Sequence, residues 1–290
     1  MKILDGLAAS KNLQSQLLKD IEIAGNLINR RPRIAIVLIG DNPASKIYVS
    51  NKQKTCASVG IEAILYSYDS SITEDSLIAV INKLNKDEQI DGIIIQQPLP
   101  KHINEETLVQ LISPDKDIDG FHPLNLGKMQ RNDPTAILPA TPYGITLLMD
   151  YYGIETIGKH CVVLGRSLIV GSPISVLMAR NNPKANSTVT LVHSSTKDPV
   201  NYTKQADILI VAIGKSNYVT ADMVKEGVVI IDVGINRVKQ GEKNIITGDV
   251  NFNSVASKAS AITPVPKGIG PMTIFALLKN TVNAIKIKYS

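Results

Sequence analysis

The stretch CVVLGRSLIVGSP, residues 161–173, is the part of the sequence that decides the fold. Its first four residues are apolar, which predicts a short buried strand, and Gly165 follows them directly. Pro173, two residues after Gly171, suits the first turn of a helix. A strand, a glycine turn and a helix start favour a bound pyrophosphate, because a helix N-terminus presents free N–H groups. The stretch does not match GxGxxG, and such glycines are also ordinary turn residues.

Four further short apolar runs follow this stretch along the chain. They are TVTLVH at 188–193, DILIVAIG at 207–214, VVIIDVG at 228–234 and AITPV at 261–265. Most of them end in glycine or in a polar turn, as strands of a parallel sheet do. The spacing resembles a dinucleotide-binding, Rossmann-like domain.

The end of the second strand indicates which dinucleotide is bound. A fold of this type that selects NAD usually has Asp or Glu there, whereas this chain has His193, Ser194, Ser195 and Thr196. No carboxylate would repel a 2′-phosphate, and Arg166 adds a guanidinium in the first turn. The hydroxyls of Ser194 and Thr196 are suitable phosphate donors, so the sequence predicts NADP. His193 either contacts the ligand or is a solvent-facing strand end.

The first half of the chain alternates helices and strands. Helices are predicted at about 9–29, 45–60 and 73–85, and strands at 33–40, 61–68 and 91–96. This order predicts a parallel α/β sheet, with a ligand crevice beyond the carboxyl ends of its strands, near 40–42 and 96–100.

The whole chain is therefore predicted to be an α/β protein of two domains. A loop-rich middle and a helix at about 142–152 separate the two series of strands, and a last helix at about 272–287 returns to pack on the first domain. We predict an N-terminal substrate domain at 1–140, completed by 271–290, and a dinucleotide-binding domain at 141–270.

Lys52 occupies an unusual position in the second predicted helix. On a helical wheel it shares the apolar face with Ser45, Tyr48 and Cys56. It could extend past the core to water, as lysines on apolar stripes commonly do, and Tyr48 could be a simple core aromatic. Gln96, at the end of an apolar strand, could face a ligand or cap a loop.

Composition excludes several classes of function. The net charge is +5, but the basic residues are dispersed and the chain has no Trp and only three Phe, which argues against nucleic-acid binding. The only tight basic cluster, Arg30, Arg31 and Arg33, follows a helix end, where cations are favoured. An anionic small ligand explains the charge equally well.

Membrane and metal chemistry are not indicated either. No apolar run approaches the roughly 18 residues of a membrane helix, and no signal-peptide core is present, so a cytoplasmic protein is expected. Cys56 and Cys161 lack a CxxC pair or a His-rich neighbour, so they are predicted to be structural thiols rather than metal ligands.

Eight motifs in one order resemble a known family. They are GDNPASKIYVSNK, DGIIIQQPLP, PDKDIDGFHPLNLG, TPYG, GRSLIVGSP, DVGIN, GDV and TPVPKGIGPMT. Together they closely resemble the bifunctional methylenetetrahydrofolate dehydrogenase/methenyltetrahydrofolate cyclohydrolase family of one-carbon metabolism, from about residue 3 to 285. Any one motif alone would be weak evidence.

The resemblance implies two reactions on tetrahydrofolate derivatives: oxidation of the methylene form by NADP⁺, then hydrolysis of the methenyl cation to 10-formyltetrahydrofolate. It implies that Lys52 is the central catalytic group, that Gln96 hydrogen-bonds it, and that Tyr48 packs near the folate ring. Asp119 would anchor the pterin edge, although an Asp that only holds the DIDG turn is an alternative. Pro271 would line the folate site.

The same resemblance assigns the cofactor site. The residues implied are Gly165, Arg166, Ser167, Gly171, Ser194, Thr196 and Ile235. Family members are commonly homodimers joined through the nucleotide domain, but nothing in these strands identifies a dimer edge. Three positions depart from the family pattern: Ala140, Leu168 and Lys267, which stand where the family commonly has Cys, Asn and Gly.

Two other functions are alternatives to this one. A two-domain oxidoreductase of the shikimate or amino-acid dehydrogenase type shares the architecture but does not explain SxxYxxxK together with QxPLP. A nucleotide-sensing binding protein without turnover is disfavoured by the intact set of Lys52, Gln96 and Asp119.

Overall fold

The computed structural model describes residues 1–240 and 243–289, apart from the side chains of 240, 243 and 244. The chain divides into two compact units. One comprises residues 13–140 and 277–290 and is here called the small-sheet unit; the other comprises 1–12 and 141–276 and is called the large-sheet unit. The assignment of folate to 1–140 and 271–290, and of the dinucleotide to 141–270, stays a prediction.

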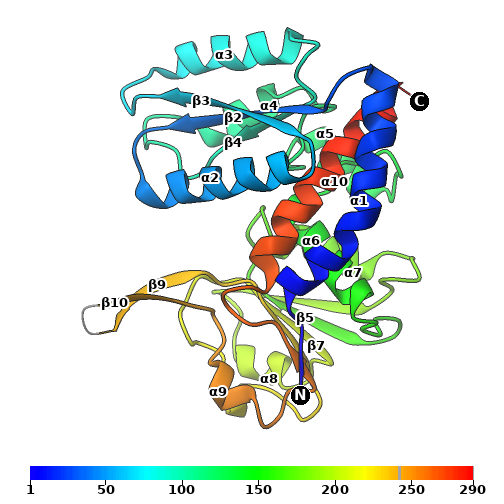
Figure 1. The fold of residues 1–290 in the computed structure, drawn as a ribbon. Coiled ribbons are helices and arrows are strands. Elements are labelled where there is room, and N and C mark those ends of the chain that lie inside the picture. Colours follow the sequence, from blue (N-terminus) through cyan, green and yellow to red (C-terminus); the bar gives the residue numbers. More distant parts are fainter. Residues whose placement is uncertain (241–242, 290) are drawn as a thin grey trace. The chain divides into compact units, whose positions relative to one another are not determined.

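The small-sheet unit is built on three parallel strands. These are β2 (Arg33–Ile39), β3 (Glu62–Tyr68) and β4 (Gly92–Ile95), in the order β3-β2-β4. The central strand β2 is buried almost throughout, which explains its continuous apolar run. Helices α2 (Pro43–Ser58) and α3 (Glu74–Lys86) lie on opposite faces of this sheet (Figure 1). The three strands confirm the predicted parallel sheet.

Four more helices contribute to this unit: α1 (Gly6–Ile28), α4 (Glu105–Leu111), α5 (Pro123–Gln130) and α10 (Ile269–Tyr289). The carboxylate of Asp20 in α1 pairs with Lys286 of α10 at 3.0 Å and with Lys279 at 3.7 Å. The buried Asn280 of α10 donates to the carbonyls of Ile118 and Leu138. From Leu277 onward the C-terminal helix thus packs within the small-sheet unit, as predicted.

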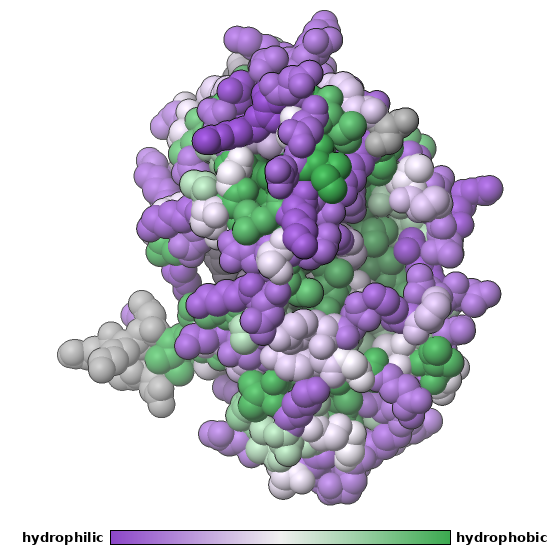
Figure 2. Space-filling model, turned by 45° about the vertical axis from the view of Figure 1, so that its right-hand side comes forward, coloured by the Kyte–Doolittle hydropathy of each residue, from purple (hydrophilic) through white to green (hydrophobic). Residues whose placement is uncertain are grey.

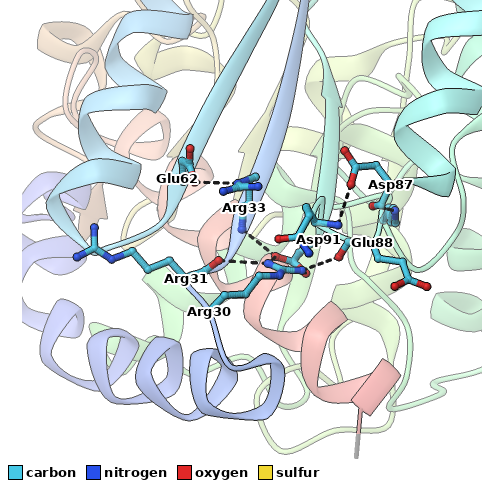
Figure 3. A network of polar contacts seen from close by, with 9 residues as sticks. Arg30, Arg31, Arg33, Glu62, Asp87, Glu88 and Asp91 are labelled. Carbon is cyan, nitrogen blue, oxygen red and sulfur yellow. Dashed lines mark hydrogen bonds and ion pairs between the residues drawn. The ribbon is translucent and has the colours of Figure 1, made fainter.

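An ion pair joins the amino ends of β2 and β4 (Figure 3). Arg30 binds both carboxylate oxygens of Asp91, at 2.7 and 2.8 Å, and also the Glu88 carbonyl. Asp91 in turn accepts the backbone N–H of Arg33. The preference for cations at a helix end, which was the only explanation that the sequence offered for the basic cluster, is therefore incomplete. The structure shows in addition that Arg30 is held by the buried carboxylate of Asp91.

The large-sheet unit is built on six parallel strands. They are β1 (Lys2–Ile3), β5 (His160–Leu164), β6 (Thr188–Val192), β7 (Ile208–Val211), β8 (Val229–Asp232) and β11 (Ala261–Ile262). Their order is β1-β11-β8-β7-β5-β6. The five predicted strands are confirmed. The sixth, β1, was not predicted because two residues carry no periodic signal.

Shorter elements complete this unit. They are α6 (Ala140–Tyr151), α7 (Gly171–Ala179), α8 (Pro199–Thr203), the 3₁₀ turn η1 (Ala221–Met223), α9 (Phe252–Val255) and the antiparallel hairpin of β9 (Asn236–Gln240) and β10 (Lys243–Thr247). The hairpin was not predicted. It follows β8 directly, before the chain reaches β11.

The surface in Figure 2 is mainly hydrophilic, with hydrophobic residues in separate small areas. Within the described residues, no helix is long and apolar enough to cross a membrane. Cys56 and Cys161 are both buried and free, and burial raises the pKa of each thiol to about 12. Such thiols are poor nucleophiles, which agrees with a structural role.

Candidate active site

The start of α2 is fixed immediately beyond the carboxyl end of β2. Asn42 caps the helix, because its side-chain oxygen accepts the N–H groups of Ala44 and Ser45 at 2.9 and 3.3 Å. Pro43 occupies the first turn, where its missing N–H has no consequence. Tyr48 and Lys52 follow one and two turns later on the same face as Ser45.

The side chain of Lys52 does not extend past the core to water. It is partly buried, and its Nζ donates to Oε1 of Gln96 at 3.1 Å. The backbone N–H of Gln96 bonds to the carbonyl of Val37, so the residue continues the ladder beyond β4. Its side-chain nitrogen donates to the Gln97 carbonyl at 2.7 Å, which leaves the amide oxygen to face the lysine.

Ser45 and Tyr48 lie near this pair in different environments. Ser45 is buried, and its hydroxyl donates to the Gln97 carbonyl at 3.3 Å, which ties α2 to the segment that carries Gln96. Tyr48 is 40% exposed, so it is not a core aromatic. An exposed ring beside a lysine and an amide is available for packing against a ligand.

Asp119 belongs to the same part of the small-sheet unit. Burial raises the pKa of its carboxyl group, while the charge of Lys52 acts in the opposite direction. The backbone carbonyl of Asp119 accepts the N–H of Ala140. The structure thus places Lys52, Gln96, Tyr48 and Asp119 in one unit, and their assignment to a folate site stays a prediction from the family resemblance.

Asp117 is a residue that sequence reasoning did not single out. It is 2% exposed, and its carboxylate accepts the backbone N–H groups of Gly120, Phe121 and His122 and the amide of Asn125. Burial nevertheless raises the pKa of Asp117 to about 7. These bonds shape the turn that presents Asp119. Asp117 is the first of the two aspartates in the motif KDIDG, and only the folded turn shows that its role differs from that of Asp119.

The large-sheet unit contains the predicted glycine turn between β5 and α7. Gly165 has a φ of +117°, and a Cβ atom there would lie 2.1 Å from the Ala212 carbonyl oxygen. A Cβ at Gly171 would lie 2.0 Å from the carbonyl oxygen of Gly165. Both glycines are therefore required by close backbone approach, which is the reason such turns can bring a helix N-terminus to a pyrophosphate.

The turn itself leaves donors at the surface. Arg166 and Ser167 are exposed, and Leu168 is 75% exposed. The Ser167 hydroxyl accepts the N–H groups of Val170 and Gly171. Val170 is the N-cap residue of α7, and its apolar side chain makes no capping hydrogen bond. The N–H of Ser172 is also taken, by the carbonyl of Ser167. The features that fit the phosphates of a dinucleotide are therefore the tight glycine turn and the exposed guanidinium of Arg166.

The turn after β6 has a defined local structure. The N–H of His193 donates to the Thr196 hydroxyl at 3.0 Å, and the N–H of Ser195 donates to Nδ1 of His193 at 3.2 Å. The His193 ring is therefore an acceptor at Nδ1 and carries its proton on the other nitrogen. Ser194 is exposed at the tip. No carboxylate occurs among residues 193–196, consistent with room for a 2′-phosphate.

Three other predicted positions lie in this unit. Ile235 follows β8 and is 49% exposed. Pro271 lies in the first turn of α10, and its role in a folate site stays a prediction. Lys267 has a φ of +83°, a left-handed conformation that costs a non-glycine residue about 1 kcal/mol, in a position where the family pattern has glycine. Among the residues described here, no three His, Cys, Asp or Glu side chains are placed to hold a metal ion.

Comparisons with known proteins agree with both halves of this description. Residues 4–119 match the catalytic domain of tetrahydrofolate dehydrogenase/cyclohydrolase, and residues 139–289 match its NAD(P)-binding domain. The bifunctional protein FolD of Cytophaga hutchinsonii is 52% identical over 291 aligned residues, covering 99% of this chain and 100% of that protein. FolD of Flavobacterium johnsoniae is 48% identical, with 99% and 98% covered.

Solved structures give the same result. The bifunctional FolD enzyme of Campylobacter jejuni superposes with a TM-score of 0.93 at 43% identity, covering 99% of both chains. The FolD of Trypanosoma brucei, solved with NADP cofactor and an inhibitor, gives 0.91 at 33% identity, covering 99% of this chain and 97% of that one.

The shikimate dehydrogenase alternative is not supported. Shikimate 5-dehydrogenase of Thermus thermophilus reaches a TM-score of only 0.51 at 13% identity, so the two share a fold and no more. The family match, by contrast, includes a dehydrogenase and a cyclohydrolase function, folate substrates and a nicotinamide dinucleotide cofactor, each of which the motifs had predicted. The chain belongs to the tetrahydrofolate dehydrogenase/cyclohydrolase family.

Proposed function

We propose that this protein oxidises 5,10-methylenetetrahydrofolate to 5,10-methenyltetrahydrofolate with NADP⁺ and hydrolyses the product to 10-formyltetrahydrofolate, using Lys52 as the central catalytic group. The observation that carries the assignment of Lys52 is its hydrogen bond to Gln96 on a partly buried helix face. This hydrogen bond holds the side-chain nitrogen of Lys52 beside Gln96.

In the hydrolysis step, Lys52 acts as a general base. The positive charge of the methenyl substrate disfavours a neighbouring ammonium group, so the neutral amine can accept a proton from the attacking water. Gln96 supports this role. Its oxygen accepts one N–H of Lys52, which fixes the direction of the nitrogen lone pair while adding no charge. In the oxidation step, Lys52 positions the substrate through polar contact and forms no covalent bond.

The folate would be held by side chains around Lys52 and Gln96. The carboxylate of Asp119 accepts N–H donors from the pterin edge, which orients the ring. The half-exposed ring of Tyr48 provides an apolar face for it. Asp117 acts indirectly, because its four hydrogen bonds shape the turn in which Asp119 lies. Pro271 is assigned to the lining of the same folate site.

When bound, NADP⁺ supplies the acceptor of the hydride. Arg166, Ser167 and Ser194 would bind its phosphates, with Thr196 supporting the 2′-phosphate turn. Because Gly165 and Gly171 have no side chains, the backbone of this turn can approach the pyrophosphate closely. Ile235, exposed beyond β8, is assigned to apolar contact with the cofactor.

The test is a coupled assay on the purified protein. Supplied with methylenetetrahydrofolate, it should reduce NADP⁺ faster than NAD⁺, and the methenyl absorbance should rise and then fall as hydrolysis follows. Supplied with methenyltetrahydrofolate alone, it should form the 10-formyl product without cofactor. Binding of both ligands without either product would show that the protein is a sensor and would refute the enzymatic proposal.

We also propose that the protein is a cytoplasmic homodimer joined through the large-sheet unit. Family resemblance is the support for the assembly. Light scattering on the purified protein measures it directly: a mass near twice the 31.4 kDa of the chain is expected, and a mass equal to one chain over a wide concentration range would contradict it.

A further inference from the structure

Two buried aspartates meet at the carboxyl edge of the six-stranded sheet. Asp232 ends β8 and is 3% exposed, and Asp249 follows β10 and is completely buried. The catalytic scheme above uses neither of them. A buried carboxylate is retained at a cost unless it receives hydrogen bonds, so its partners show what it organises.

Asp249 joins two separate loops. Its Oδ2 accepts the backbone N–H groups of Ile213 and Gly214, at 2.7 and 2.9 Å, in the loop after β7. Its Oδ1 accepts the side-chain amide of Asn236 at 2.8 Å, at the start of β9, which follows β8. One carboxylate therefore fixes the distance between the ends of two neighbouring strands.

Asp232 holds Asp249 in place. Its Oδ1 accepts the N–H groups of Gly234 and Asp249, at 2.9 and 3.0 Å, and its Oδ2 accepts that of Val250 at 2.9 Å. The packing is close: a Cβ at Gly248 would lie 1.8 Å from Oδ2 of Asp232. The two acids form a single hydrogen-bonded unit.

The two loops are those that border the proposed cofactor site. Gly165, in the pyrophosphate turn, packs against the carbonyl of Ala212, which precedes Ile213 directly. Asn236 directly follows Ile235. A continuous series of contacts thus runs from the pyrophosphate turn, through Asp249, to the exposed Ile235.

We propose that Asp249, held by Asp232, is a positioning residue that sets the loops 212–214 and 234–236 at the spacing required to bind NADP. This inference rests on the proposed function, since it concerns the same cofactor. Asp249 is not a catalytic residue: its carboxylate oxygens are occupied by Ile213, Gly214 and Asn236, and it acts only through these loops.

The pair of Asp249 and Asn236 offers a test by exchange. Asn236→Asp places a second carboxylate against Asp249, where the two repel each other and the amide donor is lost. Asn236→Asp with Asp249→Asn restores one amide and one carboxylate in reversed order. The new Asn oxygen can accept from Ile213 and Gly214, and its amide can donate to the new carboxylate. Asp207→Asn is the matched control, because Asp207 accepts the N–H of His160 and pairs with Lys225 at the amino end of the same sheet.

The main readout is the dissociation constant of NADPH, followed by the fluorescence of the bound dihydronicotinamide. Asn236→Asp should raise it about tenfold or more, and the exchanged double variant should return it to within about threefold of wild type. Hydrolysis of methenyltetrahydrofolate without cofactor should stay within about twofold in every variant, and Asp207→Asn should bind NADPH as wild type does. Thermal unfolding identifies any variant that has lost its fold.

Several results would overturn the inference. The inference is wrong if Asn236→Asp binds NADPH like wild type. It is also wrong if the exchanged double variant unfolds like wild type yet binds NADPH as weakly as Asn236→Asp. An equal loss of NADPH binding and of cofactor-free hydrolysis would show a merely structural role. Wild-type protein that binds NADPH but converts neither folate would contradict the proposed function alone, whereas failure to bind NADPH would contradict both.

Discussion

Nζ of Lys52 donates to Oε1 of Gln96 at 3.1 Å, and the amide nitrogen of the same Gln96 side chain donates to the Gln97 carbonyl at 2.7 Å. The second bond determines the first, because it leaves only the oxygen of the amide to face the lysine. Lys52 therefore has a neutral acceptor as its partner rather than a carboxylate. A neutral acceptor orients the amine and stabilises the ammonium form less than a carboxylate would, which suits a group that must take a proton.

Substitution of Lys52 by methionine should abolish hydrolysis. The variant keeps the apolar part of the side chain and removes the proton acceptor, so the rate on methenyltetrahydrofolate should fall by about a hundredfold or more. NADPH binding should be unchanged, because the cofactor is assigned to the large-sheet unit. Lys54→Met is the matched control, since Lys54 is an exposed lysine of the same helix. Unchanged hydrolysis in Lys52→Met would remove Lys52 from the mechanism.

Replacement of Gln96 by glutamate should shift the pH dependence of hydrolysis. A carboxylate at this position would stabilise the ammonium form of Lys52, so the neutral amine would appear only at higher pH. The acidic limb of the pH–rate profile should therefore move upward. Gln96→Leu removes the acceptor without adding charge and should lower the rate with no upward shift. A Gln96→Glu profile that coincides with that of wild type would contradict the base assignment.

Most strands of the two parallel sheets were predictable because each is a short apolar run closed by glycine or a polar turn, a signal contained within a few residues. The strand β1 carries no such signal. It exists because the N–H groups of Lys2 and Leu4 bond to the carbonyls of Ser260 and Ile262, far along the chain. Two residues have no period, so only the tertiary structure reveals the pairing.

The candidate site shows the same limit. Helical spacing placed Lys52 on the apolar face, and the family resemblance paired it with Gln96, but the orientation of the amide depends on the Gln97 carbonyl. Neither Asp117 nor Asp249 was singled out from the sequence. Their importance lies in the buried N–H groups that each one collects from the folded chain, and sequence patterns do not record this.

Asp117 should make the stability of the protein depend on pH in a defined direction. Burial raises its pKa from 3.8 to about 7, so between these values the folded state keeps a proton that the unfolded state has lost. The contribution of Asp117 to the free energy of unfolding is then full at acidic pH and declines as pH rises towards 7. The advantage of wild type over Asp117→Asn should shrink over this interval.

Urea denaturation of both proteins between about pH 4 and about pH 8 measures this difference. Asp207→Asn serves as the comparison, because a hydrogen bond from Lys225 lowers the pKa of Asp207. Its disadvantage should not shrink as pH rises. A disadvantage of Asp117→Asn that grows with pH would show that the four hydrogen bonds outweigh the effect of burial.

Arg166→Ala should weaken NADP binding much more than NAD binding. A guanidinium bonded to a 2′-phosphate contributes a charge-assisted interaction worth about 2 kcal/mol, or roughly thirtyfold in affinity, and NAD lacks that phosphate. Titration of the variant with NADPH and NADH measures both affinities. Lys159→Ala, which removes a cation paired with Glu155 in the same unit, should change neither. Equal weakening of both cofactors would refute the assignment of Arg166 to the 2′-phosphate.

The two ion pairs drawn in Figure 3 should differ in their contribution to stability although they share one edge of the same sheet. The Asp91 side chain is 4% exposed and accepts hydrogen bonds from Nη1 and Nη2 of Arg30. The Arg33 and Glu62 side chains, by contrast, are 30% and 49% exposed. Asp91→Ala leaves a partly buried cation unpaired and should lower the free energy of unfolding by about 3 kcal/mol. Glu62→Ala should lower it by less than about 1 kcal/mol.

Urea denaturation of the two variants gives these values. Both should keep full hydrolytic activity, because the pairs lie at the amino ends of β2, β3 and β4, whereas Gln96 follows the carboxyl end of β4. The role assigned to the buried pair would be wrong if the two variants lost equal stability. A large loss of hydrolysis in a folded Asp91→Ala protein would instead show that this edge of the sheet affects the opposite end, where Lys52 meets Gln96.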